Sequence, residues 1–404
     1  MQLQLVKLQR LLHYVRENVP YYESVLKVLP ERLNSLADLR RLPRLDKSMI
    51  RANFVGMRSR KKLPCDLSNT GGSSGEPLIF WLARHRQAAQ KAHRIRTHRW
   101  WGVEPADKEI YLWGAPVELR KQDRLKLFRD WLINEKLLNA FNMTEESITR
   151  YLQIVQSFRP QSLFGYPSSM VLLCEHALTK KLNPCDLGIK SVFCTGEVLY
   201  EHQRTLINEA LGAPVANGYG ARDAGFIAHE CPAGSMHIAA EHVIAEVLDD
   251  SGQPLPPNEM GEIVITNLDE LAMPLIRYRT GDIGALSSED CRCGRGLPLM
   301  KVVQGRTTDF IVTENGGRMH ALGLIYVLRE ISGISRFQII QRSRNHIDIL
   351  IVKNDEFPAA GADTIVRSFR KRVGDNTNVF VQFVDRISAT GSGKFRYVIS
   401  HVSH

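Results

Sequence analysis

The stretch Thr70-Gly71-Gly72-Ser73-Ser74-Gly75-Glu76-Pro77 is the part of the sequence around which the rest of the chain can be arranged. Its three glycines can adopt positive φ angles without a Cβ clash, so the backbone can curl and direct several N–H groups at one point. Together with the hydroxyls of Ser68, Thr70 and Ser73, such a nest suits an anion, and a phosphate above all. A flexible polar loop is the alternative, and a short glycine motif taken alone leaves both open.

The chain has 404 residues, which is more than one typical domain, so two or three domains are expected. Apolar residues make up 44% of it, which is enough for a sizeable core and argues against global disorder. The formal net charge of +10 favours anionic partners such as nucleotides, CoA, nucleic acid or a membrane surface, without choosing among them.

The first eighteen residues and the cysteines bear on where the protein works. Basic residues interrupt the apolar helical stripe of Leu5, Leu8, Leu12 and Val15, so no signal-peptide core is expected. No apolar run approaches the roughly 18 residues of a membrane span. Seven cysteines in a chain of this length do not suggest a disulfide framework. We therefore expect a cytoplasmic protein without a transmembrane segment.

Strand and helix patterns alternate through the first half of the chain. The expected strands are at 78–82, 109–114, 162–165, 189–195 and 214–219, and the expected helices at 84–101, 145–158 and 168–179. Such alternation predicts an α/β fold with a mainly parallel sheet and its ligand at the carboxyl edge of the strands. Gly71–Gly75, Gly196-Glu197 and Gly218–Gly220 are expected to meet at that edge. The basic residues of the helix at 84–101 are spread around its axis, so they are expected on a solvated face.

The pattern of expected secondary structure changes twice further along the chain. From about residue 237, short alternating segments such as 242–248 and 262–266 indicate a more antiparallel, β-rich subdomain. After Gly305-Arg306, strands expected at 335–341, 346–352 and 379–384 and a helix at 360–374 indicate a small α+β module. We therefore expect a large N-terminal domain, 1–304, and a small mobile C-terminal domain, 305–404.

Several short motifs follow one another in a fixed order, and together they are far more specific than any one alone. They are Thr70–Pro77, Phe164-Gly-Tyr-Pro167, Thr195-Gly-Glu197, Tyr219-Gly-Ala-Arg-Asp223, Tyr278-Arg-Thr-Gly-Asp282, Gly305-Arg306 and Ser392-Gly-Lys394. This set resembles the adenylate-forming superfamily, which includes acyl-CoA synthetases and nonribosomal adenylation domains. Within it the chain is most similar to the phenylacetate–CoA ligase branch, including the CapK-like proteins of capsule biosynthesis. The resemblance covers essentially the whole chain.

The resemblance implies a site for ATP and Mg²⁺. Thr70, Gly71, Gly72, Ser73, Ser74 and Gly75 would hold the β- and γ-phosphates, and Gly196, Glu197, Asn217, Gly218, Tyr219 and Gly220 would frame the adenine. Asp282 would accept both ribose hydroxyls, since a carboxylate can accept from two donors. Asp223 stands where the family has an acidic Mg²⁺ ligand, which suits the preference of Mg²⁺ for carboxylate and phosphate oxygens.

The same resemblance implies two catalytic cations and a chemical step. A substrate carboxylate would attack the α-phosphate, and cations would stabilise the charge that gathers on the phosphate oxygens. Lys394, on a glycine-flanked tip, matches the family lysine that reaches the α-phosphate, and Arg306 matches the arginine at the domain junction. Two residues after that arginine the family commonly has an acidic or lysine hinge residue, but this chain has Thr308, which leaves the hinge position open.

Three cysteines and a histidine form a separate group. Cys231, His237, Cys291 and Cys293 supply three thiols and an imidazole, which is the ligand set of a closed, structural zinc site. His229 is a rival fourth ligand, and free buried cysteines are the alternative. The resemblance to CapK-like proteins includes the same Cys…His…Cys-x-Cys-Gly pattern.

The acid and its acceptor are less determined. Trp113, Phe141, Phe164 and Tyr166 are candidate walls of an acyl pocket and would suit an aryl or medium apolar acid. The acceptor implied by the branch is CoA, reached after a domain rotation. A second hypothesis is an amide or ester synthetase in capsule or natural-product assembly, and a remote one is a basic, zinc-containing nucleic-acid-binding protein. A homodimer is left open.

Overall fold

The structure is a computed structural model, and it describes residues 2–29, 33–70, 78–114, 133–140, 143–180, 187–304, 310–387 and 398–402. The helices are α1 Gln2–Asn18, α2 Pro20–Val25, α3 Lys47–Ala52, α4 Arg84–Arg99, α7 Glu145–Phe158, α8 Pro167–Thr179, α9 Glu201–Leu211, α10 Leu322–Arg329 and α11 Gly361–Val373, with 3₁₀ helices η1 Leu26–Val28 and η2 Leu36–Arg41. None of the helices within these ranges has both the length and the apolar composition to cross a membrane.

One large sheet dominates the N-terminal part. Its strands are β3 Glu109–Trp113, β4 Glu135–Asn139, β5 Ser162–Gly165, β6 Ser191–Thr195, β7 Val215–Ala221, β8 Gly225–Glu230, β9 Met236–Ile238, β10 Val243–Leu248, β11 Gly261–Asn267, β12 Tyr278–Ser287 and β13 Leu299–Gln304. They are arranged in the order β10-β11-β12-β13-β9-β8-β7-β6-β5-β3-β4. In this order, β7, β6, β5, β3 and β4 pair in parallel. The remaining pairings, from β7 through β8, β9, β13, β12 and β11 to β10, are antiparallel. The expected β-rich region therefore continues the parallel sheet and is not a separate one.

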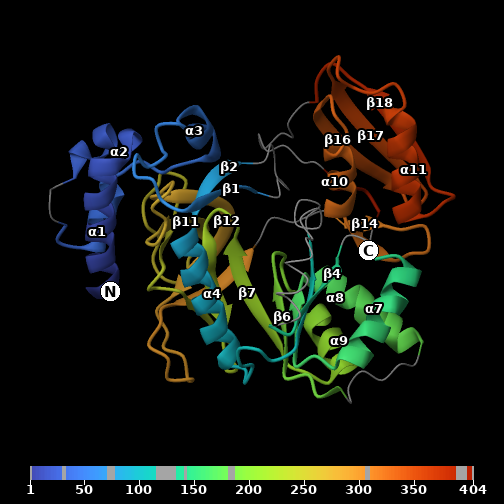
Figure 1. The fold of residues 1–404 in the computed structure, drawn as a ribbon, viewed down its shortest axis with the longest axis horizontal. Helices are drawn as coiled ribbons and strands as arrows, with labels where there is room; N and C mark the ends of the chain where they lie inside the picture. Colours follow the sequence, from blue (N-terminus) through green and yellow to red (C-terminus); the bar gives the residue numbers. More distant parts are fainter. Residues whose placement is uncertain are drawn as a thin grey trace.

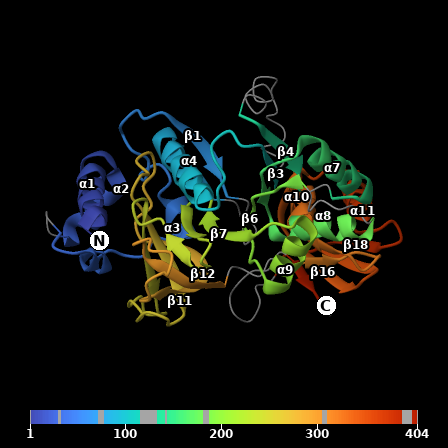
Figure 2. The ribbon, with the colours of Figure 1, turned by 90° about the horizontal axis from the view of Figure 1, so that it is seen from below.

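The two faces of the parallel part are covered by different helices. Successive residues of a strand point to opposite faces. Leu163 and Val192 accordingly pack into the core that α7, α8 and α9 cover, whereas Phe164 and Phe193 lie on the other face, where His98 of α4 stacks on Phe193. Figure 1 shows α7, α8 and α9 gathered at one end of the sheet, and Figure 2 shows α4 apart from them.

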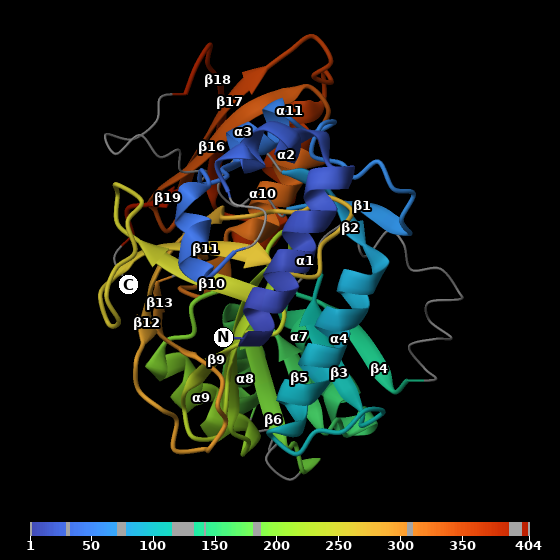
Figure 3. The ribbon, with the colours of Figure 1, turned by 90° about the vertical axis from the view of Figure 1, so that its left-hand side faces the viewer.

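The N-terminal helix packs at the antiparallel end of the sheet. Gln4 donates to the carbonyl oxygen of Val243, at the start of β10, over 3.0 Å, and Lys7 donates to that of Glu241. Leu8, Leu11, Leu12 and Val15 are buried in the same core as Ile244 and Leu268. Figure 3 shows α1 lying over β10 and β11. The apolar stripe of this helix is therefore explained by packing.

The C-terminal residues form a second, smaller sheet with its own core. Strands β16 Ile334–Ser343, β17 His346–Lys353, β18 Asn378–Phe383 and β19 Val398–Ser400 are arranged in the order β18-β17-β16-β19, and a hairpin, β14 Phe310–Val312 and β15 Arg318–His320, precedes them. Helices α10 and α11 share the apolar core of this sheet. Strand β15 approaches α8 of the large domain.

Most of the expected elements are present within one or two residues of their predicted bounds. The fold class is confirmed: an α/β domain with a large sheet is followed by a small α+β unit. The predicted boundary at 304/305 lies at the edge of the described residues and stays a prediction. A remaining hairpin, β1 Cys65–Asn69 with β2 Ile79–Ala83, brackets the glycine-rich stretch.

Candidate active site

The base of the glycine-rich stretch is closed by two hydrogen bonds. The backbone N–H of Thr70 donates to the carbonyl oxygen of Leu78 over 2.9 Å, and the N–H of Leu78 donates to Oγ1 of Thr70 over 2.9 Å. Residues 70 and 78 therefore lie beside each other. The other predicted phosphate-binding residues, Gly71 to Gly75, lie outside the described residues, as do Phe141, Arg306 and Lys394.

Gly196 and Glu197 follow β6 at the carboxyl edge, as predicted. Gly196 has φ +83°, and a Cβ there would stand 2.9 Å from Cε1 of Tyr166. Glu197 accepts hydrogen bonds from the backbone N–H and the hydroxyl of Ser168, at 3.1 and 3.0 Å. Ser168 is in the first turn of α8, where a carboxylate is favoured by the helix dipole. Glu197 thus fixes the start of α8 against the end of β6.

Strand β7 brings the next predicted residues to the same edge. The N–H of Asn217 donates to Oε2 of Glu230 over 2.7 Å, and the carbonyl oxygen of Gly218 accepts from Oγ1 of Thr195 over 2.6 Å. A Cβ on Gly220 would stand 2.7 Å from the carbonyl oxygen of Gly225, so the close pairing of the end of β7 with β8 requires glycine there. The ends of β6 and β7 are therefore tied together.

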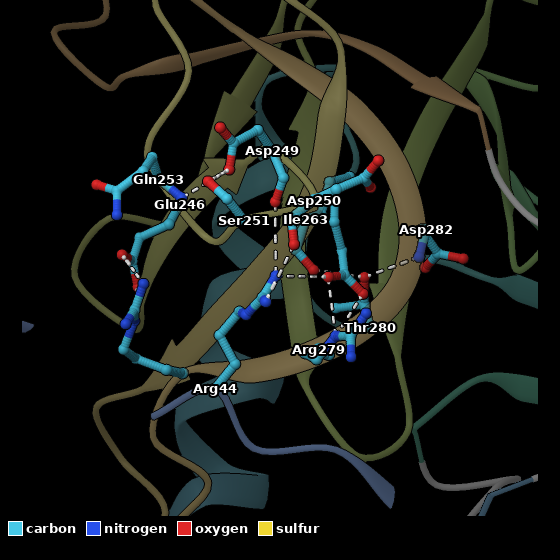
Figure 4. Close-up of polar contacts among 12 residues, drawn as sticks. Arg44, Glu246, Asp249, Asp250, Ser251, Gln253, Ile263, Arg279, Thr280 and Asp282 are labelled. Atoms are coloured by element: carbon cyan, nitrogen blue, oxygen red, sulfur yellow. Dashed lines mark hydrogen bonds and ion pairs between the residues drawn. The ribbon is translucent and has the colours of Figure 1, made fainter. Parts of the chain in front are cut away.

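Asp282 lies on β12 and reaches the residues of β7. Oδ2 of Asp282 accepts from the hydroxyl of Tyr219 over 2.9 Å. Its backbone N–H donates to Oγ1 of Thr280, which in turn donates to the carbonyl oxygen of Ile263 (Figure 4). Burial, followed by the charge of Asp282, raises the pKa of Tyr219 well above its usual value. The phenol therefore stays protonated and is the donor of this bond.

Asp223 is held from three sides and is only 4% exposed. Oδ2 accepts from the hydroxyl of Tyr278 over 2.5 Å, and Oδ1 accepts from the N–H of Ala224 over 3.0 Å. Its carbonyl oxygen accepts from Nη2 of Arg86 over 2.7 Å. Nη1 of Arg86 is also paired with Glu270. A carboxylate with its oxygens engaged in this way is rigidly placed.

The prediction of a solvated basic helix at 84–101 is wrong for two arginines. Arg86 is 1% exposed, and the side chain of Arg94 is 16% exposed. Each is buried because α4 lies against carboxylates from distant segments, Glu270 for Arg86 and Glu109 with Glu135 for Arg94. Nothing in the spacing of the arginines separates these two from their exposed neighbours. Tyr278 was also missed, although it stands in the motif that singled out Asp282.

Three of the four predicted acyl-pocket residues come together. The rings of Trp113 and Tyr166 stack with centroids 4.1 Å apart, and Trp113 lies 5.5 Å from Phe164. Trp113 and Tyr166 are the side chains that a Cβ at Gly196 would meet, so this aromatic wall adjoins the predicted nucleotide-framing segment.

A buried polar cluster lies behind the aromatic wall. The hydroxyl of Tyr111 donates to Oε2 of Glu109 over 2.6 Å, and Arg94 is within 3.5 Å of Glu109 and Glu135. Burial raises the pKa of Glu109, against the lowering effect of Arg94. Nδ1 of His98 lies 3.5 Å from Oε1 of Glu109, and the buried Nε2 of His98 has no hydrogen-bond partner. The charged cluster therefore adjoins the wall at Phe164, whereas Tyr166 and Trp113 pack against the apolar core that α7, α8 and α9 cover.

The predicted zinc ligands also converge. Sγ of Cys231 is 3.6 Å from Sγ of Cys291, and Sγ of Cys293 is 3.3 Å from Nε2 of His237. All four ligand atoms lie within 4.8 Å of one another. A tetrahedron with Zn–S near 2.3 Å and Zn–N near 2.0 Å has edges of about 3.5–3.8 Å, so the Cys231–Cys291 distance matches such an edge and the Cys293–His237 distance is slightly shorter than one. Burial raises the pKa of Cys293, but hydrogen bonds with Arg295 and the other two cysteines outweigh this effect. The pKa of Cys293 is therefore lowered to about 7. His229 lies elsewhere, with Nδ1 against the carbonyl oxygen of Glu230.

A second group of possible metal ligands is already paired with an arginine side chain. His93, Glu241 and His242 offer ligand atoms within 4.8 Å of one another. However, Arg96 donates to Nδ1 of His93 over 2.8 Å and pairs with Glu241, and Nδ1 of His242 pairs with Asp269. A guanidinium beside two of the three ligands repels a divalent ion, so we interpret this group as an ion-pair cluster.

Comparisons with protein families match both parts of the chain. Residues 127–268 match the model of the AMP-binding enzyme family, and residues 311–401 match the CapK C-terminal domain. Protein CapK of Staphylococcus aureus is 23% identical, over 99% of this chain and 89% of that protein. The phenylacetate-coenzyme A ligase of Thermus thermophilus is 28% identical, over 86% of this chain and 79% of that protein.

Comparison with solved structures agrees on the fold. Crystal structures of 2-hydroxyisobutyryl-CoA ligase align with 98% of this chain and 88% of theirs, with TM-scores of 0.70 in the thioesterification state and 0.65 in the postadenylation state, at 22% and 21% identity. The likeness shows that the large sheet and the small C-terminal unit form the same overall fold as in these structures.

Proposed function

The chain belongs to the adenylate-forming superfamily, in the branch of CapK and the phenylacetate–CoA ligases, and from this premise we propose that it activates a carboxylic acid with ATP. The proposed product of the first step is an acyl-adenylate, released with pyrophosphate. The family accounts for the glycine-rich and Tyr-Arg-Thr-Gly-Asp segments, which the nucleic-acid-binding alternative leaves unexplained.

One observation carries the nucleotide part of this proposal: the hydroxyl of Tyr219 on β7 touches Asp282 on β12. It unites the segment proposed to frame the adenine with the carboxylate proposed to accept the ribose hydroxyls. Gly196, after β6, lies at the same edge of the sheet through the Thr195–Gly218 bond. A nucleoside bound along this edge meets both a glycine-lined surface and an anionic acceptor.

The phosphates are assigned to Thr70 to Gly75, whose base is closed by the Thr70–Leu78 bonds. Asp223 fits Mg²⁺ as a carboxylate placed by fixed donors, since each carboxylate oxygen has a lone pair beyond the one already engaged. A bound Mg²⁺ would neutralise charge on the phosphate oxygens. Arg222, one residue earlier, donates to the carbonyl oxygen of Asn69 over 3.3 Å and so joins this turn to the strand that leads into the loop.

The chemistry proposed for the site is in-line displacement at the α-phosphorus. A carboxylate oxygen of the acid forms a bond to phosphorus as the bond to the pyrophosphate oxygen breaks, and pyrophosphate leaves. Lys394 and Arg306 are proposed to stabilise the developing charge, as cations do in phosphoryl transfer. In the second step the acceptor attacks the acyl carbon, and AMP leaves with the electron pair.

The aromatic wall of Trp113, Phe164 and Tyr166 supports an aryl or medium apolar acid as the substrate. CoA is the first candidate acceptor, since four relatives of this chain are phenylacetate-coenzyme A ligases. An amine or hydroxyl acceptor is the second, because CapK is similar over nearly the whole chain. The proposed location is the cytoplasm, where ATP and free CoA are available.

We further propose a structural zinc at Cys231, His237, Cys291 and Cys293. The four ligands leave no open coordination position, so the ion would stabilise the turns after β8 and before β13 and take no part in the reaction.

The proposed function is tested by acid-dependent exchange of labelled pyrophosphate into ATP, across a panel of aryl and medium-chain acids. Lys394→Ala is the control for the catalytic lysine and should reduce exchange by orders of magnitude. Hydroxylamine traps the acyl-adenylate whatever the natural acceptor, so AMP release that depends strictly on CoA separates the first acceptor from the second. No exchange with any acid, or full exchange in Lys394→Ala, would contradict the assignment.

A further inference from the structure

We propose that Tyr219 and Tyr278 are positioning residues that fix the two carboxylates of the nucleotide site relative to each other. The inference rests on the proposed function, because it takes Asp282 as the ribose acceptor and Asp223 as the magnesium ligand. It adds a role for two phenol hydroxyls and a physical link between two subsites.

The sequence contains the spacing Tyr-x-x-x-Asp twice, in Tyr219–Asp223 and in Tyr278–Asp282. In the structure the partners are exchanged. Tyr219 donates to Asp282 over 2.9 Å, and Tyr278 donates to Asp223 over 2.5 Å. Each segment therefore supplies one carboxylate and holds the carboxylate of the other.

The two segments are not neighbours in the sheet. Strands β8, β9 and β13 lie between β7 and β12 in the strand order. Side-chain bonds across three intervening strands require the sheet to curl back on itself, so β7 and β12 are connected by these hydroxyls and not by a backbone ladder. Each hydroxyl therefore acts directly on the one carboxylate that it contacts.

The two bonds differ in their surroundings, which gives them separable effects. Tyr278 and Asp223 are 1% and 4% exposed, so their bond is fully shielded from water. Asp282 is half-buried, and a carboxylate oxygen can accept more than one hydrogen bond, so Tyr219 orients Asp282 while leaving it able to accept from a ribose. Loss of the Tyr278 hydroxyl should weaken metal binding, and loss of the Tyr219 hydroxyl should weaken recognition of the ribose.

The test uses the full chain without acid, so that no turnover occurs. Dissociation constants of ATP and 2′-deoxyATP are measured by calorimetry, and the affinity of the ATP complex for Mn²⁺ is measured by electron paramagnetic resonance. In Tyr219→Phe we expect the preference for ATP over 2′-deoxyATP to fall about fivefold or more, with Mn²⁺ affinity unchanged. In Tyr278→Phe we expect Mn²⁺ affinity to fall by a similar factor, with the preference for ATP unchanged.

Tyr22→Phe is the matched control, because Tyr22 is 2% exposed and its hydroxyl donates to the carbonyl oxygen of Pro274 outside the site. It should lose thermal stability and keep both ligand readouts. If the wild type binds no ATP or does not prefer it over 2′-deoxyATP, the proposed function fails. If the wild type does both and the two site variants behave as Tyr22→Phe does, the positioning role is overturned.

Discussion

Arg86 and Glu270 form an ion pair, with Nη1 3.1 Å from Oε2, between side chains that are 1% and 0% exposed. Glu270 also accepts from the backbone N–H groups of Ala83 and Ala272, at 3.2 and 2.8 Å. Because Arg86 donates to the carbonyl oxygen of Asp223 as well, the pair connects the start of α4 to the turn that carries the proposed magnesium ligand.

Glu270→Ala should destabilise the protein by about 3–5 kcal/mol, because it leaves the Arg86 guanidinium buried without its counter-charge. Urea unfolding measures this. Asp66→Ala is the control. Asp66 pairs with Arg84 at 3.7 Å between side chains that are 54% and 69% exposed. This substitution should cost no more than about 1 kcal/mol, because the pair is exposed to solvent. Replacing both buried partners, as Arg86→Met with Glu270→Leu, should cost less than Glu270→Ala alone. Equal costs for Glu270→Ala and Asp66→Ala would refute the argument.

The Cys/His group predicts one zinc ion per chain. Cys231→Ser should abolish zinc in metal analysis and lower the melting temperature by several degrees, because a structural ion contributes directly to folding. Pyrophosphate exchange should persist at temperatures where the variant is folded. Cys65→Ser, at a half-buried cysteine on β1, should keep both the zinc and the melting temperature. A purified wild type without zinc would leave these residues as free thiols.

Buried histidines predict a loss of stability in mild acid. Burial, helped by Arg96, His242 and His229, lowers the pKa of His93 from 6.5 to about 3. Below pH 6.5 the unfolded chain binds a proton that the folded chain does not. The free energy of unfolding should therefore fall with pH, by about 1.4 kcal/mol per pH unit from this group, until about pH 3.

His93→Gln should flatten the pH dependence of unfolding between pH 6.5 and 4, whatever its cost at pH 7.5. His229, whose pKa burial lowers to about 4, contributes with the same sign and should remain. Urea titrations at half-unit steps of pH provide the measurement. His13→Gln, at a side chain that is 74% exposed, serves as the control and should leave the slope unchanged, and an unchanged slope in His93→Gln would contradict the assignment.

The sequence pattern was sufficient for local structure and for residues that share a chemical type. Alternation placed the strands, glycines after strands located the carboxyl edge, and Cys-x-Cys with a histidine located four side chains whose ligand atoms converge. Pairing between distant segments was not accessible in this way. The burial of Arg86 depends on Glu270, 184 residues later, and the continuity of the large sheet depends on β13 returning to β9, over 60 residues away. Neither pairing can be read from the periodicity of apolar residues. That periodicity indicates which face of an element a residue occupies, but not which distant residue it contacts.

Gly196→Ala tests whether the aromatic wall adjoins the nucleotide edge. Gly196 has φ +83°, and an added Cβ would stand 2.9 Å from Cε1 of Tyr166 and 3.4 Å from Cη2 of Trp113. The substitution should therefore displace the stacked pair and raise KM for the acid severalfold. Gly188→Ala is the matched control, because Gly188 has φ +71° and nothing within 4 Å of an added Cβ. It carries the same backbone penalty of about 1–2 kcal/mol without the contact. Steady-state kinetics on both variants separate the two effects. A higher KM for the acid with an unchanged KM for ATP, in Gly196→Ala alone, places the acid against Tyr166 and Trp113, whereas equal changes in both variants would remove these rings from the acyl site.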